Sequence, residues 1–235
     1  MIDGASTDGT EKLVAELRSA CAYSCSEPDR GIYDAMNKGL RRARGDFVVF
    51  MNAGDVFARP TTLAKVAEVA QRTGDVGMIV CGCENRMVNG QRFFQPPRDI
   101  AFIRHSLPTS HQAMFFRTAL HRQVPFNLTY TVSADYDAIC RMYRLNPTAA
   151  YVNDTIAYAW RGAESNSLRR PWRMLLDMAQ IQRRALKLSY PTITLSAMRR
   201  LLPVLAFYVL EVPVGSHIMY RLVLIPRPSL SPNRT

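Results

Sequence analysis

The stretch Gly31-Ile-Tyr-Asp-Ala-Met-Asn-Lys-Gly-Leu-Arg-Arg-Ala-Arg-Gly-Asp-Phe-Val-Val-Phe-Met-Asn-Ala-Gly-Asp55 decides the fold class of this chain. Apolar residues recur at helical spacing over residues 32–43, and Gly45 ends this run. Residues 47–51 are all apolar, which is typical of a parallel strand covered on both faces. Residues 52–55 follow this strand, where open α/β sheets bind their ligands. The stretch therefore predicts an α/β fold with a polar site at the end of the strand.

Strands and helices continue to alternate through the first half of the chain. Residues 1–3 look like the end of a strand, and Asp8 with Glu11 marks a helix start. A helix is expected from about Thr61, and a further buried strand over residues 76–81. Asn89-Gly90 then predicts a β-hairpin over residues 86–94. The pattern changes from α/β to mixed at this hairpin.

The second half of the chain predicts short strands and two helices. We expect a strand over residues 112–116, a helix capped by Ser133, two strands near Ala149 and Ile156, and a helix over residues 171–187. These elements complete a mixed sheet flanked by helices.

The segment after Pro191 is strongly apolar but interrupted. Residues 201–210 are nearly all apolar, yet Pro203 and Glu211 break the run. A spanning helix needs about 20 mostly apolar residues. We therefore expect residues 166–225 to form a basic helix and an interfacial or re-entrant hairpin that associates with a membrane, and not a span.

Composition indicates a folded intracellular protein. The 235 residues are 48% hydrophobic and 21% charged, which suits one α/β domain over residues 1–165 and leaves only residues 226–235 as a disordered tail. The five cysteines are odd in number and lack zinc-finger spacing, so we interpret them as reduced structural thiols. The polar start of the chain lacks the pattern of a signal peptide. These features favour a cytoplasmic location.

Positive charge is concentrated in the last third of the chain. Residues 160–235 contain twelve Lys and Arg against three Asp and Glu, which gives +9 of the total +11. This asymmetry indicates a surface that meets phospholipid head groups or nucleic acid, with a solvated helix face as the alternative. The cations lie beside an apolar segment and not among stacking aromatics, so nucleic acid is disfavoured. We expect peripheral binding at the inner face of the cell membrane.

Several short motifs, taken in order and spacing, resemble family 2 glycosyltransferases of the GT-A fold. Within that family the chain most resembles bacterial enzymes of colanic-acid and other exopolysaccharide assembly. The resemblance implies a GT-A, Rossmann-like mixed sheet, and it also implies a strand and helix ahead of Ile2, so we expect this sequence to be truncated at its N-terminus. The motifs are residues 2–10, 27–39, 45–46, 52–55, 111–113, 134–137 and 162–165.

The resemblance places a donor site on the first 55 residues. Asp55 is the expected ligand of Mg²⁺ or Mn²⁺, because such a metal, held by few carboxylates and by substrate phosphates, neutralises the leaving diphosphate. Asn52 replaces the first Asp of many members, and a carboxylate in a tight turn is the alternative for Asp55. Asp3 and Asp29 are expected near the nucleotide. Lys38 is either a cation for the diphosphate or a surface lysine.

Asp135 matches the family's catalytic base at the head of a helix. An acceptor hydroxyl must lose its proton as it attacks the sugar, and a carboxylate kept ionised by the helix N-terminus can accept it. A capping carboxylate is the alternative. Asp137 points about 200° away around the helix and is a weaker candidate. Ala134 stands where many members carry Glu, so a second acidic group is missing.

Four further residues are expected on the acceptor or diphosphate side. His111 and Gln112 could bind sugar hydroxyls or phosphate, although a lone His is more often structural. Trp160 could stack on a sugar ring or be a core residue, and Ser165 could donate to the diphosphate.

The expected function is inverting, metal-assisted transfer of a sugar from a nucleotide-sugar donor to a lipid-linked or saccharide acceptor, in surface polysaccharide or glycolipid synthesis. The alternative is a catalytically silent, truncated remnant that binds a membrane or partner proteins.

Overall fold

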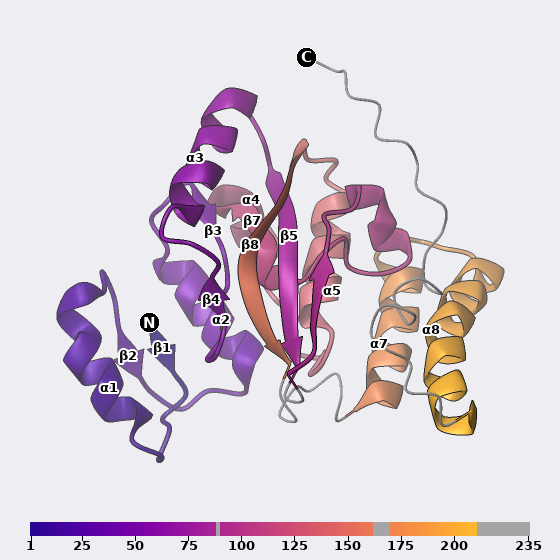
Figure 1. Cartoon of the computed structure of the whole chain (residues 1–235), viewed down its shortest axis with the longest axis horizontal. Coiled ribbons are helices and arrows are strands. Elements are labelled where there is room, and N and C mark those ends of the chain that lie inside the picture. The colour runs from indigo at the N-terminus through magenta and orange to yellow at the C-terminus, as the bar shows by residue number, and fades with distance from the viewer. Residues whose placement is uncertain (88–89, 162–169, 211–235) are drawn as a thin grey trace. The chain divides into compact units, whose positions relative to one another are not determined.

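The computed structural model describes residues 1–87, 90–161 and 170–210. The chain divides into two compact units, Met1–Leu188 and Ser189–Thr235. The first unit contains a two-stranded sheet, a six-stranded mixed sheet and the helices that flank them (Figure 1).

Strand β5 (Met78–Met87) is the centre of the six-stranded sheet, whose order is β3-β7-β5-β8-β4, with β6 paired to β5. It runs parallel to β8 and antiparallel to β6 and β7. This mixture of directions is the one expected from the sequence. The other strands are β3 (Phe47–Val48), β4 (Val56–Phe57), β6 (Arg92–Gln95), β7 (Met114–Arg117) and β8 (Ala149–Arg161).

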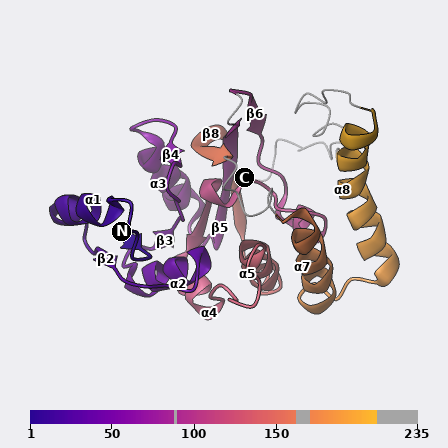
Figure 2. The ribbon, with the colours of Figure 1, turned by 90° about the horizontal axis from the view of Figure 1, so that it is seen from below.

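Helices cover both faces of this sheet, with α2, α4 and α5 on one side and α3 on the other (Figure 2). Side chains alternate along β5, so Met78 and Val80 pack into the first layer, and Ile79 and Cys81 into the second. Helix α7 also packs into the first layer. The helices are α2 (Ile32–Arg42), α3 (Thr62–Thr73), α4 (Thr118–Gln123), α5 (Ala134–Tyr143) and α7 (Pro171–Arg184).

The N-terminal residues form a small sheet of their own beside α2. β1 (Ile2–Asp3) pairs in parallel with β2 (Cys25–Ser26), and α1 (Thr10–Glu16) with the 3-10 helix Leu17–Ala20 connects them. Asp8 accepts a hydrogen bond from the Thr10 N–H at 3.1 Å, so the expected helix start is confirmed. Ile2 reaches α2 at Gly39, where a Cβ would lie 3.6 Å from its Cγ1.

The predicted strand over residues 47–51 differs from the one found. β3 covers two residues at one end of the sheet order, runs antiparallel to β7 and is half-buried. The prediction of a parallel strand covered on both faces was therefore wrong. An apolar run alone does not reveal the direction of a strand or how deeply it is buried. Here Phe50 packs against His121 and Phe126 in the core and is not part of the strand.

Two other strand predictions change in extent. The strands expected near Ala149 and Ile156 are one strand, β8, whose register against β5 shifts around Gly82. The sequence did not predict one continuous strand, because a β-bulge interrupts the alternation of inward and outward side chains. Residues 111–113 form a 3-10 helix, so the strand expected over residues 112–116 begins at Met114. The hairpin is confirmed by the pairing of Arg86 with Arg92.

The helices near the C-terminus were only partly expected. α7 agrees with the helix predicted over residues 171–187, and it belongs to the first compact unit. In the second unit, α8 (Tyr190–Leu210) continues through Pro203, so no hairpin turn occurs there. Residues 211–225, where the rest of the hairpin was expected, and the tail at 226–235 lie outside the described residues. Within the described ranges, no helix is both long and apolar enough to cross a membrane.

Candidate active site

Asp55 lies in a tight turn immediately before β4, and its carboxylate is held by three N–H donors. Oδ2 accepts from the Asn52 main-chain N–H and from Gln112 Nε2, each at 3.0 Å, and Oδ1 accepts from the Trp160 main-chain N–H at 3.1 Å. Gly54 has φ +88°, which a residue with a side chain rarely adopts. The turn therefore presents Asp55 in one orientation.

Asp135 lies in the first turn of α5 with its side chain 14% exposed. Its Oδ1 accepts from the Tyr136 N–H at 2.8 Å and from Tyr33 Oη at 3.1 Å. Its Oδ2 is 3.3 Å from His111 Nδ1. Ser133 occupies the N-cap position but makes no capping bond with its hydroxyl, so Asp135 supplies the first-turn acceptor.

The environment of Asp135 favours its ionised form. Burial by itself would raise the pKa of this carboxyl, but the hydrogen bonds from His111, the Tyr136 N–H and Tyr33 outweigh burial and lower the pKa. The pKa of Tyr33 is raised well above its usual value, first by burial and then by the charge of Asp135. Tyr33 is thus a permanent donor to a carboxylate that is charged at neutral pH.

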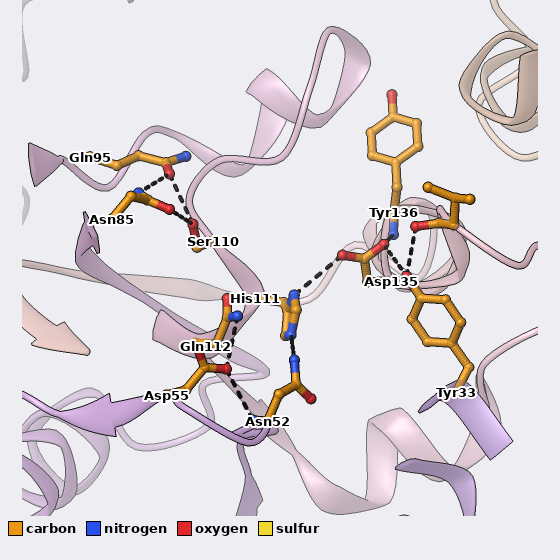
Figure 3. Close-up of polar contacts among 11 residues, drawn as sticks. Tyr33, Asn52, Asp55, Asn85, Gln95, Ser110, His111, Gln112, Asp135 and Tyr136 are labelled. Carbon is orange, nitrogen blue, oxygen red and sulfur yellow. Dashed lines mark hydrogen bonds and ion pairs between the residues drawn. The ribbon is translucent and has the colours of Figure 1, made fainter. Parts of the chain in front are cut away.

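His111 connects these two carboxylate sites (Figure 3). Its Nδ1 faces Asp135, and its Nε2 lies 3.2 Å from Asn52 Nδ2, in the turn that carries Asp55. The next residue, Gln112, contacts Asp55. Segments from 52–55, 111–112 and 135 thus meet in one polar network. Trp160 joins it through its main chain.

Asp3, Asp29 and Lys38 lie around β1, β2 and the start of α2. A Cβ added at Gly4 would collide with the Asp29 carboxylate, so the Asp29 side chain packs against the residue that follows Asp3. Ser6 and Ser26 donate to Asp3 and lower its pKa. Lys38 Nζ is 2.9 Å from Glu27 Oε1 and 2.7 Å from the Pro28 carbonyl oxygen, so protein groups hold this ammonium.

A match to the family described as Glycosyl transferase family 2 covers residues 1–148, which is more than half of the chain. The chain belongs to glycosyltransferase family 2.

Two curated relatives support this membership. A PGL/p-HBAD biosynthesis glycosyltransferase of Mycobacterium bovis is 30% identical over 178 residues, which are 72% of this chain and 67% of the relative. An uncharacterized glycosyltransferase of Mycobacterium tuberculosis is 32% identical over 144 residues, which are 60% of this chain. The match covers 55% of that relative, so this chain spans little more than half the length of the relative.

Solved structures show the same fold. Staphylococcus aureus TarS 1-349 in complex with UDP-GlcNAc has a TM-score of 0.59 at 19% identity, with 94% of this chain and 69% of that chain covered. The mannosyltransferase PcManGT from Pyrobaculum calidifontis, in complex with GDP-Man and Mn²⁺, has a TM-score of 0.57 at 18% identity, with 94% and 74% covered. The expected GT-A-like α/β fold is confirmed.

The residues around Asp55 in this family 2 chain fit a metal only in part. Within the described ranges, no group of three His, Cys, Asp or Glu side chains could hold a metal by itself. Gln112 is 3% exposed, and its Oε1 has no hydrogen-bond partner within the described part of the chain. One carboxylate beside an unsatisfied oxygen suits Mg²⁺ or Mn²⁺ that keeps waters and is completed by substrate phosphates.

Some residues of the site were not predicted, and others lie apart from the network. Tyr33 was missed, because nothing in its helical spacing signals a contact with residue 135. Trp160 is 51% exposed and packs over Gly54, which excludes the alternative of a core tryptophan. Ser165 lies outside the described residues. Asp137 pairs with Arg141 at 2.8 Å and does not face the network.

Proposed function

We propose that this chain transfers a sugar from a nucleotide-sugar donor to an acceptor hydroxyl with inversion at the anomeric carbon. The observation that carries the proposal is the network in which an ionised Asp135 and a fixed Asp55 are joined by His111. This arrangement supports the assignment of Asp135 as the proton acceptor and of Asp55 as the carboxylate on the diphosphate side. Family membership supports the same reaction class.

Asp135 is the general base in this proposal. The acceptor oxygen forms a bond to the anomeric carbon from the face opposite the leaving group, and its proton passes to the Asp135 carboxylate. The bond between the anomeric carbon and the diphosphate oxygen breaks, and its electron pair leaves with the nucleoside diphosphate. A single displacement of this kind inverts the anomeric configuration.

Asp55 and Gln112 hold the diphosphate side. Asp55 would hold a divalent cation, which would neutralise the charge on the leaving diphosphate. Asp3 and Asp29 face the nucleoside, and Lys38 stabilises this segment through Glu27 and Pro28. The bound UDP-GlcNAc and GDP-Man of the two similar structures support a nucleoside diphosphate sugar as the donor class.

The proposed acceptor is lipid-linked or a growing saccharide, in glycolipid or surface polysaccharide synthesis. The relative from Mycobacterium bovis named for PGL/p-HBAD biosynthesis supports the glycolipid alternative. The charge of +9 over residues 160–235 supports peripheral association with anionic lipid at the cytoplasmic face of the membrane.

Donor binding and turnover test this function together. The wild-type chain is titrated calorimetrically with UDP- and GDP-sugars with and without Mn²⁺, and nucleoside diphosphate release is then measured. We expect metal-dependent binding, and a rate loss in Asp135→Asn of roughly 10²-fold or more with donor binding retained. Asp137→Asn is the matched control, because this neighbouring carboxylate faces Arg141.

Three results would contradict the proposal. Unchanged turnover in Asp135→Asn removes the assignment of the base. Binding without any turnover in the wild type favours the catalytically silent alternative, and the absence of any donor binding removes the donor site itself. Thermal unfolding of both Asn variants verifies that a rate loss does not come from misfolding.

A further inference from the structure

His111 uses both ring nitrogens on protein partners. Nδ1 lies 3.3 Å from Asp135 Oδ2, and Nε2 lies 3.2 Å from Asn52 Nδ2 (Figure 3). The side chain is 15% exposed. Little of the ring is therefore left to bind a sugar hydroxyl or a phosphate, which was the role expected from the sequence.

These partners determine where the ring carries its proton. An ionised carboxylate only accepts hydrogen bonds, so Nδ1 must carry a hydrogen toward Asp135. In a neutral imidazole the other nitrogen is then an acceptor, and the Asn52 amide nitrogen is a donor. In this arrangement Asn52 Nδ2–H donates to His111 Nε2, and His111 Nδ1–H donates to Asp135 Oδ2. Each of these four atoms then has a hydrogen-bond partner.

The backbone around His111 is fixed from both sides. Ser110 is 2% exposed, and its Oγ lies 3.0 Å from Gln95 Oε1 and 3.2 Å from Asn85 Oδ1. The Asn85 amide in turn donates to Gln95 at 3.2 Å. On the other side, Gln112 donates to Asp55. Consecutive residues thus attach to the core, to the base and to the metal-side carboxylate.

We propose that His111 is a positioning residue that orients Asp135 through Nδ1–H and ties this orientation, through Nε2, to the turn carrying Asp55. The catalytic part of this inference rests on the proposed function. Displacement of the Asn52–Asp55 turn would pull on the imidazole and rotate the carboxylate of the base. The donor side and the acceptor side then act as one unit.

Asn52 is the residue that holds the Nε2 side of the ring. Its amide nitrogen can donate to Nε2, whereas a carboxylate at the same position could only accept a hydrogen bond. Asn52→Asp should therefore break the connection between His111 and the turn that carries Asp55.

Nitrogen NMR of ¹⁵N-histidine-labelled full-length protein tests the tautomer without any substrate. The chain has four histidines, and loss of a signal in His111→Gln assigns this one. We expect the Nδ1–H tautomer in the wild type at pH 7.5 and a changed Nε2 signal of this ring in Asn52→Asp, where the amide donor is lost. An Nε2–H tautomer in the wild type, or a ring unaffected by Asn52→Asp, overturns the inference.

Kinetics test the positioning role itself. In His111→Gln we expect kcat to fall roughly 10²-fold, because a base displaced by about 1 Å loses that much. The donor KM should stay unchanged, since the lost interaction acts in the transition state. His105→Gln is the matched control and should keep the wild-type kcat. A raised donor KM with unchanged kcat would assign His111 to donor binding and overturn the proposal.

The results can contradict the inference about His111 and the proposed function separately. If the wild-type chain shows no turnover with any donor, the proposed function is contradicted, and the NMR result alone still decides the hydrogen-bond assignment. If turnover is normal and the tautomer is wrong, the function stands and the inference about His111 falls.

Discussion

Tyr33 Oη, on α2, lies 3.1 Å from Asp135 Oδ1 and 2.8 Å from the Val132 carbonyl oxygen, both more than 90 residues away in the sequence. The phenol therefore joins α2 to the start of α5, the helix that carries Asp135, the proposed base. Burial and the Asp135 charge raise the pKa of Tyr33 well above its usual value, so this contact is not lost by ionisation at any physiological pH.

Tyr33→Phe removes this donor and leaves the ring in place. The free energy of unfolding should fall by about 1 kcal/mol, measured by urea denaturation, because a buried hydrogen bond is lost. The pKa of Asp135 should rise toward its ordinary value of 3.8. Its lowered pKa stabilises the fold above that value, and this stabilisation is lost as pH falls through the folded pKa. The acid limb of kcat should therefore move to higher pH, and an unmoved limb contradicts this role.

Ser110→Ala tests the buried cluster behind His111. The serine hydroxyl supplies a hydrogen to two acceptors, Asn85 Oδ1 and Gln95 Oε1, and Ser110 is 2% exposed. Removing it should cost about 1–3 kcal/mol of stability and loosen the segment that carries His111 and Gln112. Thermal unfolding measures the first effect. Ser106→Ala serves as the control, and equal stability of the two variants would show that the cluster does not contribute to the free energy of unfolding.

Local patterns in the sequence predicted part of the site. Asp55 and Asp135 belong to short contiguous motifs that predicted a role for each carboxylate, and in the structure both belong to one hydrogen-bonded network. The hydrogen bonds to Tyr33 and Ser110 come from segments brought together only by folding, and no spacing within one segment encodes them. The position of β3 at the edge of the sheet and its direction were not predicted from the sequence either, because both depend on which strands lie beside it.

His121 gives the fold a sensitivity to acid. The ring is completely buried among Phe50, Phe116 and Phe126, with centroid distances of 4.9–5.3 Å, and neither ring nitrogen has a hydrogen-bond partner among the residues that the structure describes. Burial lowers the pKa of His121 from 6.5 to about 4. The unfolded chain therefore binds a proton before the folded chain does. Stability should fall as pH decreases from 6.5 toward 4, by up to about 1.4 kcal/mol per pH unit.

His121→Phe should remove this dependence, since phenylalanine suits the aromatic surroundings and does not titrate. Urea unfolding of the wild type and the variant at several values between pH 7 and pH 4 measures the difference. The two stability curves should separate progressively on acidification. Parallel curves would show that His121 does not titrate between the folded and unfolded states in this range.

Trp160 offers an exposed aromatic face beside the turn that carries Asp55, and its ring can be removed without removing its main-chain bond to Asp55. Trp160→Ala therefore isolates the contribution of the ring. Aromatic stacking contributes about 0.5–1.5 kcal/mol, and 1.4 kcal/mol corresponds to a tenfold change in affinity. If a sugar or base stacks on this ring, the KM for the donor or the acceptor should rise by up to about tenfold while kcat changes little.

Trp172 is the matched control for this test, because it is the second tryptophan of the chain and is 67% exposed on α7. Trp172→Ala should leave both KM values unchanged. In a Trp172→Phe background, Trp160 is the single tryptophan, so its fluorescence reports ligand binding directly. Quenching by a UDP- or GDP-sugar alone assigns the ring to the donor, and quenching only after the acceptor is added assigns it to the acceptor. A signal that responds to neither shows that the ring stacks on no substrate.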